Sequence, residues 1–315
     1  QQERGVTRLS NDETTAITEA LTAELHRRAP PSTSTCDVAW DTVSGEVIVF
    51  STSNTVLELV RPLVFDTFGV TIRPERQSDW LMEKFGRSEV LERIDAFIPG
   101  ARGSAGLGEP IDGYYPDDPL DGALQPLAVD FLTWLWVQSE AADGHFRVIE
   151  SSGVADAAHA RMDDVDDEWN DITETLRSAD ITLWLEGRLK LTRLGDDDGY
   201  ETTVILGEAP TTSDAVRLDV QAGKVPVEAN FGMKLGDLEA RMSLSATPGG
   251  LNVSGVKLPF EIKKGTDEKI FERMMLLDLL HTTLKQLFQQ FFLTRTSSAW
   301  SDRIDAWRAE DLAAK

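Results

Sequence analysis

The chain has 315 residues, of which 41% are hydrophobic and 8% aromatic. This composition excludes a disordered protein and suffices for one large or two ordinary globular domains. The formal net charge of −23 opposes contact with polyanions at long range and keeps a protein soluble. The carboxylates are dispersed along the chain, and lysine supplies only 10 of the 31 basic residues. We therefore favour adaptation to a salty cytoplasm over avoidance of polyanions. At 1 M salt the screening length falls to about 3 Å.

The first part of the chain predicts a helix and a hairpin. Ser10 and Glu13 have the spacing of a capping box. Apolar residues at helical spacing follow, so residues 11–28 are expected to form an amphipathic helix. Apolar and polar residues alternate over 36–41, and residues 46–51 form a second strand-like run beyond a Ser-Gly turn. The two runs together indicate a β-hairpin.

Further helices are expected after the hairpin. Residues 54–68 have an apolar, helical pattern, in which Pro62 is expected to kink or shorten the helix and Gly69 to end it. Residues 70–73 predict a third short strand. Residues 78–98 predict one or two helices, broken near a glycine.

A change of composition then divides the chain. Residues 99–127 contain six glycines and five prolines, which predict a long irregular connection. We therefore expect three parts: a helix-flanked hairpin region at 1–98, the Gly/Pro-rich connection at 99–127, and a region of sheet and C-terminal helices at 128–315.

The last part predicts a sheet between helices. Residues 128–142 form a strongly apolar run that is typical of a core helix. Alternation over 181–192 predicts a strand, a helix is expected at 212–222, and two helices are expected at 267–294 and 297–312. The remaining expected strands cover residues 203–206, 224–234, 239–245 and 251–258. The expected fold class is α+β, with a mainly antiparallel sheet and long C-terminal helices.

No motif of catalysis or metal binding is evident. The four histidines do not stand at zinc-ligand spacing, and nucleotide-binding, hydrolase and kinase signatures are missing. We therefore expect a protein that is not an enzyme and takes no cofactor or metal. No apolar run approaches the roughly 18 residues of a membrane span. The single cysteine, Cys36, rules out an intrachain disulfide and favours the cytoplasm; the alternation around it predicts a buried small apolar residue rather than a nucleophile.

Several segments, taken in order, resemble one known family. They are DVAWD at 37–41, FSTS at 50–53, FGV at 68–70, FLTWLW at 131–136, VQAGKV at 220–225 and GVKLP at 255–259. This ordered set is similar to the recombination-associated protein RdgC family over most of residues 10–300. The resemblance implies a ring-shaped homodimer that encircles double-stranded DNA without reading sequence and restrains the recombinase RecA. It also implies a nucleoid-associated cytoplasmic protein with no cofactor and no catalysis, and a further N-terminal portion before Gln1.

Basic residues that could face DNA phosphates gather in few places. Arg188 and Lys190 share one face of a predicted strand, with Arg193 close behind, and a second group flanks the turn between the last strand and the long helix. The residues predicted to face DNA are Arg188, Lys190, Arg193, Lys224, Lys257, Lys263 and Lys264. Any one of them could equally balance a nearby carboxylate on a solvated face.

A second function is kept open beside DNA binding. The chain could be an acidic protein-interaction module that binds no DNA and docks through the apolar stripe of its C-terminal helix at 267–294. Ordinary core packing is the favoured interpretation of that stripe.

Overall fold

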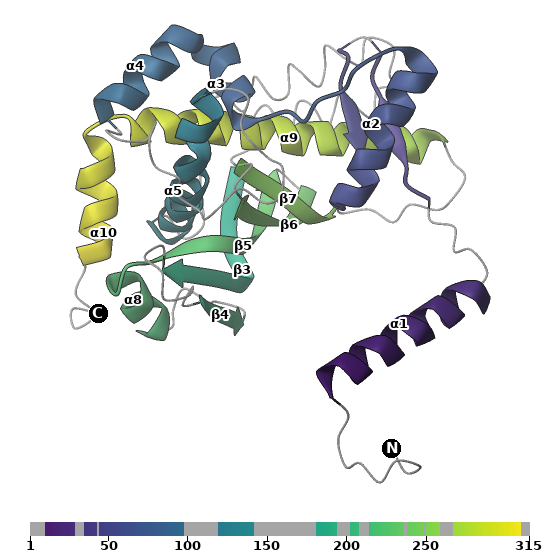
Figure 1. Ribbon diagram of the computed structural model, residues 1–315. Helices are drawn as coiled ribbons and strands as arrows, with labels where there is room; N and C mark the ends of the chain where they lie inside the picture. The colour runs from purple at the N-terminus through teal and green to yellow at the C-terminus, as the bar shows by residue number, and fades with distance from the viewer. Residues whose placement is uncertain are drawn as a thin grey trace. The chain divides into compact units, whose positions relative to one another are not determined.

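The computed structural model describes residues 10–28, 35–42, 44–97, 119–141, 181–193, 202–207, 214–235, 238–247, 250–258 and 267–309. The elements follow one another in the order α1 (Asn11–Arg28), β1 (Val38–Trp40), β2 (Val47–Val49), α2 (Asn54–Phe68), α3 (Gln77–Phe85), α4 (Arg87–Phe97), α5 (Pro119–Ala141), β3 (Ile181–Arg193), β4 (Thr202–Gly207), α8 (Asp214–Gln221), β5 (Lys224–Leu235), β6 (Leu238–Thr247), β7 (Gly250–Lys257), α9 (Asp267–Arg295), a π-helical turn (Ser301–Asp305) and α10 (Ala306–Ala309) (Figure 1). The expected α+β fold class is confirmed.

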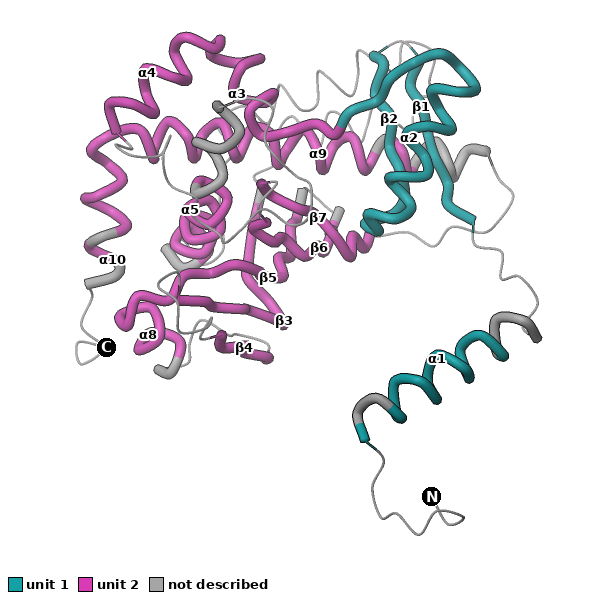
Figure 2. Tube along the Cα trace, in the orientation of Figure 1, with its two compact units in different colours: residues 1–73 teal, residues 74–315 magenta. Residues whose placement is uncertain are grey.

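The chain forms two compact units, Gln1–Arg73 and Pro74–Lys315 (Figure 2). The division falls inside the stretch 1–98 that composition suggested as one part. Helices α3 and α4 therefore belong with the sheet and the C-terminal helices, and not with the hairpin.

The first unit contains the expected helix and hairpin. The capping box at the start of α1 is present, because the Glu13 amide donates to Ser10 Oγ at 3.2 Å and the Ser10 amide donates to Glu13 Oε2 at 3.1 Å. Strands β1 and β2 pair in antiparallel register, with Val38 opposite Val49 and Trp40 opposite Val47. The local patterns were therefore sufficient to predict these elements.

Two details of this unit differ from the prediction. Helix α2 continues past Pro62 to Phe68, so the proline does not shorten it. The helix ends at Gly69, as expected, with a left-handed φ of 68°. Residues 70–73 form no strand, because among the described residues no third strand lies beside the hairpin to pair with them.

Most apolar side chains of the first unit stay exposed. Val60 is its buried hydrophobic residue among the described positions, whereas Leu59 and Leu63 of α2 are 67% and 64% exposed. The strand β1 also keeps Trp40 exposed, although alternation predicted it to face inward. Cys36 is only half-buried, so the prediction of a buried cysteine is wrong. This unit has little core of its own.

The second unit is built on a five-stranded antiparallel sheet in the order β4-β3-β5-β6-β7. The strands predicted by alternation are confirmed. β3 bulges between Leu185 and Leu189, where three of its residues stand opposite Asn230, and Gly187 accommodates the bulge with a φ of 68°.

One face of the sheet is covered by α5, which packs against β3, β5, β6 and β7. The helix begins at Pro119, nine residues earlier than expected, so the end of the Gly/Pro-rich stretch is helical rather than irregular. Proline is tolerated there because the first-turn N–H groups of a helix have no intrahelical acceptor. Residues 98–118 lie outside the described residues.

Helix α9 packs against α3 and α5 and completes the core. Phe131 of α5 meets Phe288 and Phe291 of α9 with ring centroids 5.1 and 5.4 Å apart. The apolar residues of α9 from Leu276 to Phe292 are largely buried in this core. This part of the stripe is core, as the favoured interpretation of core packing expected, and it is not exposed for docking a partner.

The C-terminal helix predicted at 297–312 is confirmed over residues 299–309, with a π-helical turn inside it. A π-helical turn at Ser301–Asp305 precedes α10. Trp300 and Ile304 are buried, and Trp307 packs edge-on against Trp136 at 5.0 Å between ring centroids. Among the helices described, none is both long and apolar enough to cross a bilayer.

Candidate nucleic-acid interface

The sheet of the second unit has two chemically different faces. Residues such as Leu183, Phe231 and Leu244 lie on the side covered by α5 and are buried. The alternate residues lie on the opposite side, which we call the outer face. It comprises residues 182, 184, 186, 188 and 190 of β3, 204 and 206 of β4, 228, 230, 232 and 234 of β5, 239, 241, 243 and 245 of β6, and 252, 254 and 257 of β7.

Basic side chains outnumber acidic ones on the outer face. The basic residues are Arg188, Lys190, Lys234, Arg241 and Lys257, and the acidic residues are Glu186, Glu228 and Glu239. Five positive against three negative side chains leave two positive charges in excess. This local sign is opposite to that of the whole chain, whose formal net charge is −23.

The two arginines of the outer face form ion pairs with its carboxylates. Arg188 Nε lies 3.2 Å from Glu228 Oε1. Arg241 reaches two carboxylates, with Nε 3.4 Å from Glu186 Oε1 and a terminal nitrogen 3.1 Å from Glu239 Oε1. These exposed pairs fix the direction of the guanidinium groups more than they stabilise the fold.

The three lysines differ from the arginines. Within the described part of the chain, Lys190, Lys234 and Lys257 make no ion pair. They stand on β3, β5 and β7, and Lys234 and Lys257 are exposed while Lys190 is half-buried. The outer face therefore offers three ammonium groups whose charge no carboxylate of the described residues neutralises.

Neutral polar residues lie between these charges. Asn230, Ser243 and Ser254 stand opposite one another across three strands, and Ser245 pairs with Asn252 in a neighbouring row. Hydroxyl and amide side chains are the groups that, with Lys and Arg, most often contact phosphate and sugar oxygens. Their chemistry fits that of the surrounding lysines.

Three of the predicted DNA-facing residues share the outer face, although Lys257 lies three strands away from Arg188 and Lys190. Arg188 and Lys190 are neighbours on β3, and Lys257 lies on β7 opposite Arg241. The prediction that Lys263 and Lys264 join them lies outside the described residues.

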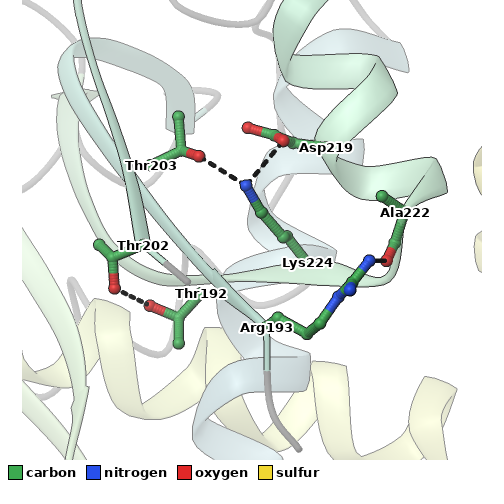
Figure 3. A network of polar contacts seen from close by, with 7 residues as sticks. All are labelled: Thr192, Arg193, Thr202, Thr203, Asp219, Ala222 and Lys224. Carbon is green, nitrogen blue, oxygen red and sulfur yellow. Dashed lines mark hydrogen bonds and ion pairs between the residues drawn. The ribbon is translucent and has the colours of Figure 1, made fainter. Parts of the chain in front are cut away.

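Arg193 points to the other side of the sheet. Successive side chains of a strand alternate between the two faces of the sheet, and Arg193 is an odd number of residues after both Arg188 and Lys190. Its side chain therefore lies on the opposite face, on the side of α8. Its guanidinium donates to the Ala222 carbonyl at 2.6 Å, just beyond the C-terminal end of α8 (Figure 3). Arg193 therefore binds a carbonyl at a helix end, and we remove it from the residues predicted to face DNA.

Lys224 is the clearest correction to the predicted site. Its side chain is only 5% exposed, and its Nζ lies 2.8 Å from Asp219 Oδ1 and 2.8 Å from Thr203 Oγ1 (Figure 3). Burial raises the pKa of Asp219, but hydrogen bonds from Lys224 and Thr203 and the lysine charge together hold that pKa below its usual value. Lys224 therefore joins β5 to α8 and β4, and its charge is not available to a phosphate.

The sequence interpretation overlooked Lys234 and Arg241. Both lie on the outer face, in strands where buried residues alternate with polar ones. Phe231 and Met233 are buried beside Lys234 in β5, and Ala240 and Met242 are buried beside Arg241 in β6. The same alternation placed Arg188 and Lys190 correctly, so it carried enough signal to find the other two.

Among the described residues, no three His, Cys, Asp or Glu side chains lie close enough together to hold a metal ion. No family model matches the chain, and no curated protein or solved structure matches it significantly.

Proposed function

We propose that this protein binds double-stranded DNA without reading its sequence, and that the outer face of the sheet contacts the DNA phosphates. The observation that carries this proposal is the excess of basic over acidic side chains on the outer face of a strongly acidic chain. A random surface of this protein would be negative, so a positive face is where a polyanion would be directed.

Lys190, Lys234 and Lys257, which make no ion pair with a described residue, are the main contacts in this proposal. Each ammonium group that neutralises a phosphate releases condensed counterions from the duplex, and this release drives binding irrespective of sequence. The serine and asparagine side chains between them would donate to phosphate or sugar oxygens and set the orientation of the duplex. Lys263 and Lys264 remain predicted additional contacts.

The acidic remainder of the molecule also has a role in this proposal. Its net negative charge repels DNA at long range, so it favours approach of the duplex through the outer face. In a salty cytoplasm this repulsion is screened within a few ångströms, while counterion release is weakened. The proposed complex should therefore show moderate affinity.

The resemblance to the RdgC family adds two finer proposals. One is a homodimer that encloses the duplex; the other is a restraint on RecA in the nucleoid. Light scattering tests the first. For the second, RecA-driven strand exchange should slow when the protein is added and recover when the outer face is altered.

The decisive test replaces the three lysines together by Lys190→Glu, Lys234→Glu and Lys257→Glu. We expect duplex affinity to fall equally for all sequences and the log–log salt slope to flatten by about 2.7, since each lost phosphate contact contributes about 0.9. Fluorescence anisotropy of a labelled duplex over a salt series measures both quantities.

A matched triple controls for net charge. Arg61→Glu, Lys84→Glu and Arg87→Glu make the same change of charge at exposed positions of α2, α3 and α4. Equal losses in the two triples would mean that net charge alone governs binding and that the outer face is not the interface. A parent protein that binds no duplex even at low salt would refute the proposed function itself.

A further inference from the structure

The outer face carries one aromatic residue in an unusual position. The indole of Trp184 on β3 lies across Gly232, its cross-strand partner on β5. A Cβ atom added at Gly232 would stand 2.0 Å from Cε2 of the indole. The ring therefore lies directly over the glycine backbone, while the side chain as a whole remains only half-buried on the outer face.

A hydrogen bond to a paired carboxylate fixes the orientation of this ring. Trp184 Nε1 donates to Glu186 Oε2 at 2.9 Å, and the other oxygen of the same carboxylate lies 3.4 Å from Arg241 Nε. One carboxylate thus links the indole to a guanidinium group. The orientation of the ring is thus fixed before any ligand binds, so the side chain loses little conformational entropy when a ligand stacks on it.

Three basic residues and two carboxylates, Glu186 and Glu239, stand in or next to the row of Trp184 on the outer face. Arg241 is the cross-strand partner of Gly232, and Lys257 is the partner of Arg241, so one row across the sheet carries the ring and two positive charges. Lys234 stands two residues from Gly232 on the same strand. A flat aromatic ring beside Lys and Arg is the combination that binds single-stranded nucleic acid, with a base on the ring and its phosphates on the cations.

We infer that Trp184 is a stacking site for an unpaired base of DNA, in a single strand or at a distorted position of a duplex. The inference rests on the proposed function, because the same lysines and arginine would bind the backbone. Arg241 is paired with Glu186 and Glu239, whereas Lys234 and Lys257 make no ion pair among the described residues. These two lysines therefore favour a polyanion over a cationic ligand on the ring. A free nucleotide shares this chemistry, but it offers fewer phosphates to the cations than a strand does.

A purely structural role for Trp184 gives a different expectation. An aromatic ring over a glycine also protects the exposed backbone of a sheet, and such a ring needs no ligand. Any large apolar side chain would serve that purpose, whereas only an aromatic ring can stack on a base. Leucine and phenylalanine at this position therefore separate the two roles.

The test compares the parent with Trp184→Leu and Trp184→Phe. The probes are a fluorescent oligothymidine, a fully paired duplex and deoxythymidine monophosphate. We expect Trp184→Leu to weaken oligothymidine binding roughly 5- to 150-fold, the range that corresponds to stacking of one base. Duplex affinity should change less than about 2-fold, within the error of non-additive effects, and Trp184→Phe should restore most of the loss. The same change at an exposed tryptophan of the first unit, Trp40→Leu, is the matched control.

The outcomes distinguish this inference from the proposed function. Unchanged oligothymidine binding by Trp184→Leu would overturn the stacking site, and so would an equal loss for oligothymidine and duplex, which would indicate a structural role. Binding of the monophosphate as tightly as the strand would also overturn it, in favour of a nucleotide site. If the parent binds oligothymidine through Trp184 but no duplex, the stacking site stands and the proposed duplex function falls.

Discussion

The buried ion pair of Lys224 and Asp219 shows how one residue can look like a ligand contact and act as a structural link. Lys224 is 5% and Asp219 22% exposed, so the lysine depends on the carboxylate and on Thr203 for compensation of its charge. Removing the carboxylate takes the negative charge away from a buried ammonium group, whereas removing the lysine leaves a carboxylate that water can still reach. The two changes should not be equivalent.

We expect Asp219→Asn to lower the free energy of unfolding by about 3 kcal/mol, at the lower end for a broken buried pair because Asp219 is partly exposed. Lys224→Met should cost about 1 kcal/mol, mostly from polar groups left without a partner, and should leave duplex affinity unchanged. Urea denaturation at neutral pH and anisotropy measure the two effects. A loss of affinity in a folded Lys224→Met protein would return Lys224 to the DNA interface.

The pH dependence of this pair has a definite sign. The folded-state pKa of Asp219 lies below its ordinary value of 3.8, so the unfolded chain binds the proton first as the pH falls. The stabilisation is complete above that ordinary value and is lost as the pH drops through the lower folded-state pKa. The stability difference between the parent and Asp219→Asn should therefore shrink below about pH 4.

At the scale of elements, Trp184 and Gly232 couple β3 to β5. Gly232→Ala places a methyl group where the indole lies, so the ring must move and the variant should lose about 1–3 kcal/mol of stability. In the Trp184→Leu background, a more flexible side chain can yield, and the same alanine should cost less. A double-mutant cycle by urea denaturation measures this difference. Equal costs in both backgrounds would show that the ring does not constrain Gly232.

Elements with a strong local pattern could be predicted from the sequence. The capping box at Ser10 and the alternation around Leu189 and Phe231 both depend on neighbours in the chain, and both were found. The start of α5 was missed because its first turn is rich in glycine and proline, and its apolar partners lie far along the chain. The exposure of Trp40 was also missed, because alternation states which residues share a face but not whether anything covers that face.

The residues of the candidate site also divide into those that a local pattern predicts and those that depend on distant parts of the chain. The outer-face positions of Arg188 and Lys190 follow from the pleat of β3, whereas that of Lys257 depends on the irregularity at Gly255, between Ser254 and Lys257. The burial of Lys224 depends on α8 folding back over β5, which brings Asp219 to it. No residue pattern near Lys224 predicts that contact. The sequence alone therefore could not distinguish a buried, paired lysine from a lysine that faces DNA.

For the whole molecule, the net charge predicts a dependence on salt. Self-repulsion among dispersed carboxylates weakens as the Debye length falls from about 10 Å at 0.1 M to about 3 Å at 1 M salt. We therefore expect the melting temperature to rise between 0.1 and roughly 3 M KCl. Circular dichroism at several salt concentrations measures it, with sucrose at matched water activity as a control for general exclusion effects. A flat or falling melting temperature would contradict the adaptation to high salt.

The sparse core of the first unit has a thermodynamic consequence for the whole chain. Val60 is buried there, while Leu59, Leu63 and Trp40 are exposed, and the large aromatic core belongs to the second unit. Burial of apolar surface is the dominant favourable term in folding, so the two units differ in their free energies of unfolding. The hairpin and α2 can therefore unfold while the sheet and α9 stay folded. Partly unfolded species then belong to the native ensemble, and a two-state analysis of unfolding does not apply to the whole chain. A free energy of unfolding obtained from heat or denaturant then belongs to the second unit, and the first unit has a separate and smaller one.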